Sequence, residues 1–193
     1  MKHSVRSTLL CLGAGVVVQR ILQLLAFIIV GRTLGVSGLG VYAEGMAVAA
    51  ILAVLAGAGI RNLVARAVSQ QPTATRALVG HAVYMRLLTG VMLAIVAIAV
   101  GFMASTRPWF WLLCAMHVVP AAFDLKNLVD AAGRTRSEVL LDSVAAALQL
   151  SLVAAWALTG NQQLEVLAAI SLACRCLYAV GAILQIRRLP GED

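Results

Sequence analysis

The stretch Arg86–Arg107, RLLTGVMLAIVAIAVGFMASTR, decides the fold, because the 20 residues between its two arginines carry no charge. A helix needs about 20 mainly apolar residues to cross the hydrocarbon of a bilayer. The whole chain agrees with this stretch: 62% of its 193 residues are hydrophobic and 12% are charged, against about 25% charged in a soluble domain. The sequence therefore predicts an integral membrane protein.

Similar apolar stretches recur on both sides, separated by glycine, proline and charged residues that favour loops. We predict an all-α membrane protein, a single bundle of six transmembrane helices with no separate soluble domain. The predicted spans are residues 8–30, 41–60, 80–102, 108–129, 139–158 and 165–186.

The basic residues between these spans predict the orientation. One side would hold ten of them, namely Lys2, Arg6, Arg61, Arg66, Arg76, Lys126, Arg134, Arg136, Arg187 and Arg188, and the other side only Arg32 and Arg107. Cytoplasmic loops carry the excess of Lys and Arg, so both termini are expected in the cytoplasm. The net charge of +7 is spread over short clusters, which argues against a nucleic-acid partner.

Three arginines fall inside predicted spans, where a charge costs about 2.5–3.5 kcal/mol on insertion scales. Arg20 and Arg175 lie about 15 Å from either surface at helical rise, too deep to snorkel. Gln19 and Gln23 share a helix face with Arg20. We therefore predict an anion-binding cavity with Arg20 and Arg175 as its cations and these glutamines as its polar wall. Arg86 lies about 9 Å deep and is a secondary candidate, with snorkelling as the alternative.

Two carboxylates are candidates for coupling to an ion, Asp124 and Glu44. Asp124 is expected to be the only acidic residue within a span that lies far from its outer end, at the depth of Arg86, so a simple ion pair between the two is the alternative. Glu44 lies near the outer end of its span. The four cysteines lie in apolar stretches without metal-ligand spacing, so neither a metal site nor a cofactor is predicted.

Residues 19–67 resemble the start of polysaccharide flippases of the multidrug/oligosaccharidyl-lipid/polysaccharide exporter superfamily. The residues that carry the resemblance are Gly31-Arg32-Thr33-Leu34-Gly35, Gly40-Val41-Tyr42, Gly59-Ile60 and Arg66, and later Pro120, Asp124 and Gly133-Arg134. Leu39 departs from the phenylalanine that is usual in that family.

The resemblance implies a transporter of polyprenyl-pyrophosphate-linked oligosaccharide in the bacterial plasma (inner) membrane, acting in lipopolysaccharide or other polysaccharide biosynthesis. Arg20 and Arg175 would then meet the pyrophosphate. The chain corresponds to the amino-terminal half of the family's fold, so a homodimer or a separately encoded second half is the expected assembly.

Two alternatives stay open at this point. Gly35-Val36-Ser37-Gly38 fits the serine motif of rhomboid-like intramembrane proteases, but Ser37 follows one span only, and we predict no catalytic residue. The chain could also be a non-transporting remnant of a truncated exporter.

Overall fold

The computed structural model of the chain describes residues 2–57, 75–104, 107–123, 135–160 and 162–186. These residues form helices, and no strand occurs among them. The elements are α1 (Lys2–Gly57), α3 (Thr75–Ala104), α4 (Pro108–Met116), α5 (Val118–Ala121), α7 (Thr135–Leu158) and α8 (Leu164–Ile186). The prediction of an all-helical protein is confirmed for the described residues.

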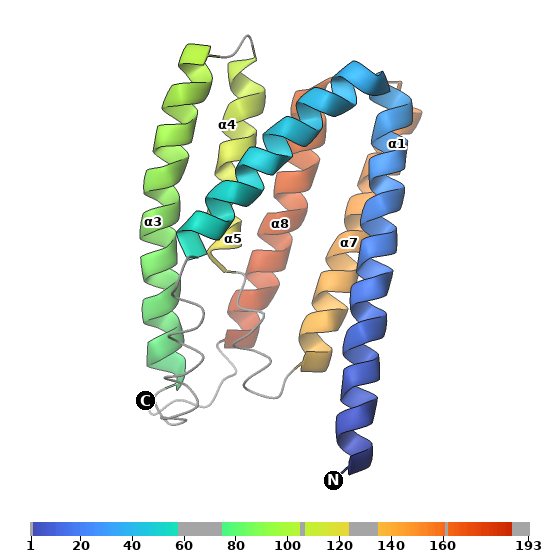
Figure 1. Cartoon of the computed structure of the whole chain (residues 1–193), viewed down its shortest axis with the longest axis vertical. Helices are drawn as coiled ribbons and strands as arrows, with labels where there is room; N and C mark the ends of the chain where they lie inside the picture. The colour runs from blue at the N-terminus through green and yellow to red at the C-terminus, as the bar shows by residue number, and fades with distance from the viewer. Residues whose placement is uncertain (1, 58–74, 105–106, 124–134, 161, 187–193) are drawn as a thin grey trace.

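Helix α1 is bent into two arms at Gly35. Its 56 residues would reach about 84 Å if straight, far beyond the roughly 30 Å of bilayer hydrocarbon. At Gly35 the backbone has φ 70° and ψ −176°, a conformation open to glycine because it lacks Cβ. The first arm therefore rises to Gly35 and the second descends from it (Figure 1).

The bend differs from the predicted loop between residues 30 and 41. A break over several residues is expected there, but only Gly35 leaves the helical conformation within α1. One residue with positive φ is enough to reverse the chain's direction here, so the helix on each side extends to the bend. The predicted end of the second span at residue 60 lies outside the described residues.

The stretch predicted as the fourth span is broken in the structure. Helix α4 ends at Met116, His117 is a turn residue, and α5 lasts only from Val118 to Ala121. Pro120 has no N–H to donate to the carbonyl of Met116, so it interrupts the hydrogen-bond ladder at this place. Ala122 and Phe123 follow as turn residues, and the rest of this span, from Asp124 onward, lies outside the described residues.

Four described helices are long and apolar enough to cross a membrane, counting the bent α1 once; the stretch Pro108–Ala121 is a shorter apolar segment. In Figure 1 successive segments run in alternating directions, and α8 ends at the end of the bundle where α1 begins. Helices α3, α7 and α8 contain the predicted spans 80–102, 139–158 and 165–186 in full, and α8 begins one residue before its span, at Leu164.

The helices approach one another closely where small residues meet large ones. A Cβ on Gly45 would lie 2.7 Å from Cε1 of Phe110, and one on Gly181 would lie 2.6 Å from Cδ1 of Leu141. Small residues at helix interfaces allow this approach in membrane bundles. Gly45 thus joins the second arm of α1 to α4, and Gly181 joins α8 to α7.

The apolar core lies toward the bend of α1. It contains buried residues of both arms, of α4, of the last turns of α7 and of the start of α8: Val30, Tyr42, Phe110, Cys114, Val153, Trp156, Leu164, Leu167 and Ala168. Phe110 and Leu167 are completely buried. The core therefore fixes the arms of α1 against the other helices at this end.

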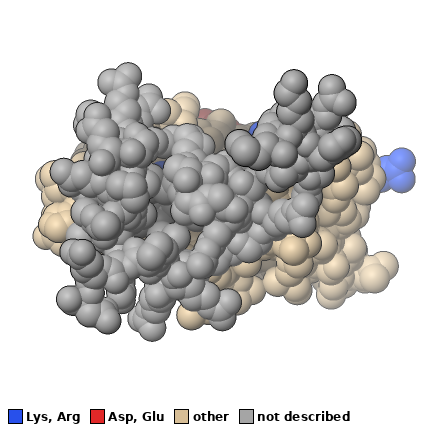
Figure 2. Space-filling view, turned by 90° about the horizontal axis from the view of Figure 1, so that it is seen from below, with Lys and Arg blue, Asp and Glu red and all other residues tan. Residues whose placement is uncertain are grey.

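The sides of the bundle are apolar and exposed. Large side chains such as Val54, Met92, Ile95 and Leu140 are each 62–72% accessible. Seen from the end where α1 begins, the surface around the grey residues is mostly uncharged, with one Lys or Arg group protruding at the right edge and small charged areas elsewhere (Figure 2). Such a surface requires hydrocarbon around it, so the chain is a multi-pass membrane protein.

Candidate functional site

A small polar cavity lies between the first arm of α1, α7 and α8. Its volume is about 20 Å³, room for about one water molecule. The polar residues that line it are Gln19, Gln23, Asp142, Gln149, Arg175 and Tyr178, and the remaining lining is small: Ala145, Ala146 and Cys174. Polar side chains from three helices therefore converge on this cavity.

Helical spacing brings these side chains to one place. Gln19 and Gln23 are four residues apart on α1, and Arg175 and Tyr178 are three apart on α8, so each pair lies on one helix face. Asp142 and Gln149 are two turns apart on α7. The structure therefore brings together three of the predicted site residues, Gln19, Gln23 and Arg175.

Arg175 lies at the middle of its helix. It is eleven residues from Leu164 and eleven from Ile186, the two ends of α8, which is about 16 Å in each direction. Its side chain is exposed although it also lines the cavity. Arg175 thus borders both the cavity and the surface of the bundle.

A hydrogen-bond network continues from the cavity into the core. The hydroxyl groups of Tyr42 and Ser171 are 3.0 Å apart, and Gln149 Nε2 donates to Ser171 Oγ at 3.4 Å. Ser171 is one turn before Arg175 on α8 and is 1% exposed. The network links the second arm of α1, α7 and α8 around the place where Arg175 lies.

Arg20 does not line the cavity. Its side chain is exposed, and its Nη1 donates to Gln23 Oε1 at 3.4 Å. Gln23 in turn lines the cavity with Arg175. Arg20 is therefore connected to the cavity through Gln23 and lies outside its wall.

Arg86 lies elsewhere and contacts the backbone. It is 5% exposed, and its Nη2 donates to the carbonyl of Ala121 at 3.0 Å. Gly57 at the end of α1 makes room for the guanidinium, since a Cβ there would lie 3.2 Å from Nη2. Arg86 thus joins α3 to the end of α5 and to α1. Its predicted partner Asp124 lies outside the described residues.

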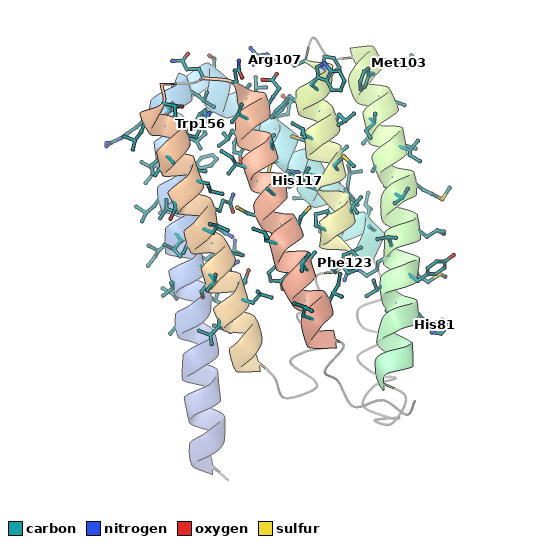
Figure 3. The ribbon with its side chains drawn as sticks, turned by 180° about the vertical axis from the view of Figure 1, so that it is seen from behind. His81, Met103, Arg107, His117, Phe123 and Trp156 are labelled. Atoms are coloured by element: carbon teal, nitrogen blue, oxygen red, sulfur yellow. The ribbon has the colours of Figure 1, made fainter. Side chains whose placement is uncertain are left out.

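His117 occupies the break between α4 and α5. Its Nδ1 donates to the carbonyl of Leu113 at 2.9 Å, since a carbonyl only accepts. Within the described part of the chain, its buried Nε2 has no hydrogen-bond partner. Figure 3 shows this residue between α8 and α4. His117 is a polar group of the interior that the predicted site did not include.

A second, much larger space is a groove between the second arm of α1 and α3. Its volume is about 910 Å³, within the range of small-molecule sites. Glu44 lines it together with Ser37 and Arg107, and most of the other lining residues are apolar. Glu44, predicted as a coupling carboxylate, is therefore separate from the polar cavity at Arg175.

One expectation about acidic residues is wrong. Asp124 is predicted to be the only acidic residue within a span far from its outer end, yet Asp142 lies within the predicted fifth span and lines the cavity with Arg175. Its position near the inner end of residues 139–158 is visible in the sequence. Gln149, one of the other lining residues on α7, could be found because it lies seven residues after Asp142 on the same helix face.

The protease alternative gains no support from the site. Ser37 lines the large groove, whereas His117 is buried between helices and its Nδ1 is bonded to Leu113. Among the described residues, neither the large groove that Ser37 lines nor the polar cavity has a histidine in its lining. A serine nucleophile needs such a base within hydrogen-bond reach.

Comparison with known proteins relates most of the chain to a family. Residues 5–126 match the family described as polysaccharide biosynthesis protein. Neither a curated protein nor a solved structure matches the chain. The family match covers α1, α3, α4 and α5, which include the first arm's Gln19 and Arg20, and it ends before α7 and α8.

Proposed function

The chain belongs to the polysaccharide biosynthesis protein family, and from this premise we propose that it forms one bundle of a flippase. The proposed substrate is a polyprenyl-pyrophosphate-linked oligosaccharide, moved across the bacterial plasma membrane for lipopolysaccharide or related polysaccharide synthesis. In this proposal the chain is a transporter and performs no catalysis.

The observation that carries the proposal is the placement of two exposed arginines at mid-helix. Arg175 is about 16 Å from either end of α8, and Arg20 is joined to the same cavity through Gln23. Both are exposed, and an arginine facing hydrocarbon at this depth would be costly. A water-filled space beside the bundle would remove this cost and would offer two cations to a pyrophosphate.

The volume of the polar cavity supports transport by opening and closing. At about 20 Å³ the cavity admits about one water and no sugar. Access for the substrate would require the first arm of α1 and α7 to move relative to α8. In transporters such movements occur between two bundles around a site at the bilayer midplane. We therefore propose that a second bundle, either a second copy or a separately encoded half, faces Arg20 and Arg175.

The proposed topology has six crossings with both termini in the cytoplasm. The two arms of α1 would form two crossings, and the broken α4–α5 segment would begin the fourth. Thiol labelling of single-cysteine variants of the protein in intact cells tests this topology. Val36→Cys, at a position that is 91% exposed, and Gly160→Cys should react with an impermeant reagent, whereas Gln71→Cys and Gly133→Cys should react only after permeabilisation. Labelling of Gly133→Cys in intact cells would contradict the topology.

Cysteine cross-linking at the surface that would face the second bundle tests the assembly. A cysteine at Gln19 or at Leu172, each on a helix that borders the cavity, should cross-link to a second copy or to another membrane protein in native membranes. The cross-linked assembly, and not the separated chain, should move lipid-linked oligosaccharide in liposomes. Transport by a purified monomer would overturn the two-bundle proposal, while loss of transport from every assembly would overturn the flippase itself.

Coupling to an ion completes the proposal. Glu44, on the second arm of α1, and Asp124, outside the described residues, stay the proposed coupling carboxylates. Glu44 is exposed and lines a mainly apolar groove, and an ionisable side chain within a span is a candidate for ion coupling.

A further inference from the structure

His117 completes the end of α4 with its side chain. Its backbone N–H donates to the carbonyl of Cys114, three residues back, at 3.2 Å. In a continuous α-helix this N–H would bond to the carbonyl of Leu113, four residues back. The imidazole takes its place, because Nδ1 donates to that carbonyl at 2.9 Å. The position of the imidazole and the break between α4 and α5 therefore depend on each other.

The same hydrogen bond fixes the state of the ring. Nδ1 carries the proton, so Nε2 is the unprotonated nitrogen of a neutral imidazole. His117 is 6% exposed, and its buried Nε2 has no hydrogen-bond partner among the described residues. A buried polar atom without a partner is uncommon in native proteins and requires an explanation. Nε2 is thus a buried atom that can accept a proton.

Positive side chains lie on two of the helices that pack against the break. Helices α3 and α8 both contact α4 and α5. On α3, Arg86 donates to the carbonyl of Ala121, one turn after His117. On α8, Arg175 is eleven residues from the start of its helix, and His117 is nine residues from the start of α4. Both helices begin at the end of the bundle where α1 bends (Figure 3), so these two residues lie at similar depth.

The remaining ionisable groups at this level do not offset these charges. They are Tyr42 and Glu44 on the second arm of α1 and Cys114 on α4. Tyr42 is bonded to Ser171, Cys114 is buried, and Glu44 lines the groove on the side of α3. A proton on Nε2 would add a cation among positive neighbours and leave a charged N–H without an acceptor. The closed packing therefore requires His117 to be neutral.

The break also supplies a hinge. The segment after His117 is fixed to α3, because Arg86 holds the carbonyl of Ala121 at 3.0 Å and a Cβ on Gly90 would lie 3.0 Å from Cγ1 of the fully buried Val118. Pro120 removes one hydrogen bond of the helical ladder in this segment. Separation of α8 from the break would bring water to Nε2, and the end of α4 then favours a cation through its helix dipole.

We propose that His117 is a proton-binding residue that couples opening of the bundle beside Arg175 to pH. The ring is neutral, with its proton on Nδ1, while α4 and α5 are packed against α8. It carries a proton on both nitrogens once α8 has moved away. This role rests on the proposed transport function, in which the cavity at Arg175 opens to admit the substrate, and it adds a proton site to the two coupling carboxylates. Neither test below measures transport, so the two proposals can fail separately.

Nitrogen NMR of the histidine-labelled full chain in lipid bilayers tests the protonation states. The signal of His117 is identified by its loss in His117→Gln. At about pH 8 it should show a neutral ring protonated on Nδ1 alone, and an imidazolium signal should replace it as the pH falls to about 5, the range in which histidine titrates. A proton on Nε2 at the higher pH, or a ring that stays neutral at the lower pH, would overturn the proposal.

A distance measurement between α4 and α8 tests the coupling to opening. Met116→Cys and Leu177→Cys place spin labels at positions that are 41% and 56% exposed, in a chain with Cys11→Ser and Cys176→Ser. Labelling at about pH 8 spares Cys114 and Cys174, which are buried in the closed bundle. The distance between the labels should lengthen between about pH 8 and pH 5.

The matched variants are His117→Gln and His81→Gln. His117→Gln should keep the short distance at both pH values. His81 is an exposed histidine on α3, so His81→Gln should respond to pH like the original chain. A distance that does not change with pH in the original chain would overturn the proposal, and so would a pH response that persists in His117→Gln. A chain that opens in this way but moves no lipid-linked oligosaccharide in any assembly would refute the flippase and leave the role of His117 in opening intact.

Discussion

Replacing Arg175 with glutamine should abolish transport of lipid-linked oligosaccharide while the protein stays inserted in the membrane. Arg175 is the cation that lines the polar cavity at the middle of α8. Removing one partner of a desolvated charge pair costs about 2–5 kcal/mol, which corresponds to a loss of roughly 30-fold or more in affinity for the pyrophosphate. Insertion should persist, because a cation at mid-helix depth, which costs about 2.5–3.5 kcal/mol on insertion scales, is removed.

The measurement is complementation of glycan export in cells, with membrane abundance determined in parallel. Arg20→Gln should reduce export less, because Arg20 reaches the cavity only through Gln23. Arg32→Gln is the matched control, since Arg32 is an exposed arginine on α1 that lines neither the cavity nor the groove. Export at the original level by Arg175→Gln would exclude the cationic site. Loss of the protein from the membrane would instead indicate a structural ion pair, whose disruption costs about 3–5 kcal/mol.

Replacing Gly45 with alanine should destabilise the bundle, although alanine is the better helix former. A Cβ at position 45 would lie 2.6 Å from Cζ of Phe110 and 2.8 Å from Sγ of Cys114. Those side chains are 0% and 1% exposed, so they have no free space to enter. Overpacking of this kind costs about 1–3 kcal/mol, and Gly45→Val should cost more.

Gly40→Ala is the matched control on the same arm of α1. A Cβ at position 40 has no heavy atom within 4 Å, so alanine there should stabilise the helix by up to about 1 kcal/mol. Thermal unfolding in detergent, followed by fluorescence-detected size exclusion, should therefore shift in opposite directions for the two variants. An unchanged or raised Tm for Gly45→Ala would show that the contact of α1 with α4 is not tight, and a lowered Tm for Gly40→Ala would show that position 40 is not open.

Several features were determined by the sequence alone, because the membrane acts on each helix separately. The 20 uncharged residues between Arg86 and Arg107 must be helical in hydrocarbon, where every backbone N–H and C=O needs an internal partner. The structure has α3 there. The resemblance of residues 19–67 to polysaccharide flippases was likewise readable from spaced local residues, and the family match over residues 5–126 agrees with it.

The predicted polar stripe on the first helix was also local information. Gln19 and Gln23 share a face because of helical periodicity, and both line the cavity. The same periodicity places Arg20 close to them, but it does not determine which of these three side chains face a neighbouring helix. The packing of the first arm on α7 decided this point, leaving Arg20 exposed.

Tertiary structure decided which helices share a polar site. Asp142 and Gln149 join Arg175 because α7 lies between the first arm of α1 and α8, and no sequence spacing relates these helices. Arg86 was grouped with the two central arginines by its charge, yet the packing of α3 against α1 and α5 places its guanidinium on the carbonyl of Ala121. The groove beside Glu44 likewise depends on the angle that α1 adopts after Gly35. Depth in the membrane follows from position along one helix, whereas direction toward a neighbour depends on contacts between helices that the chain brings together only when folded.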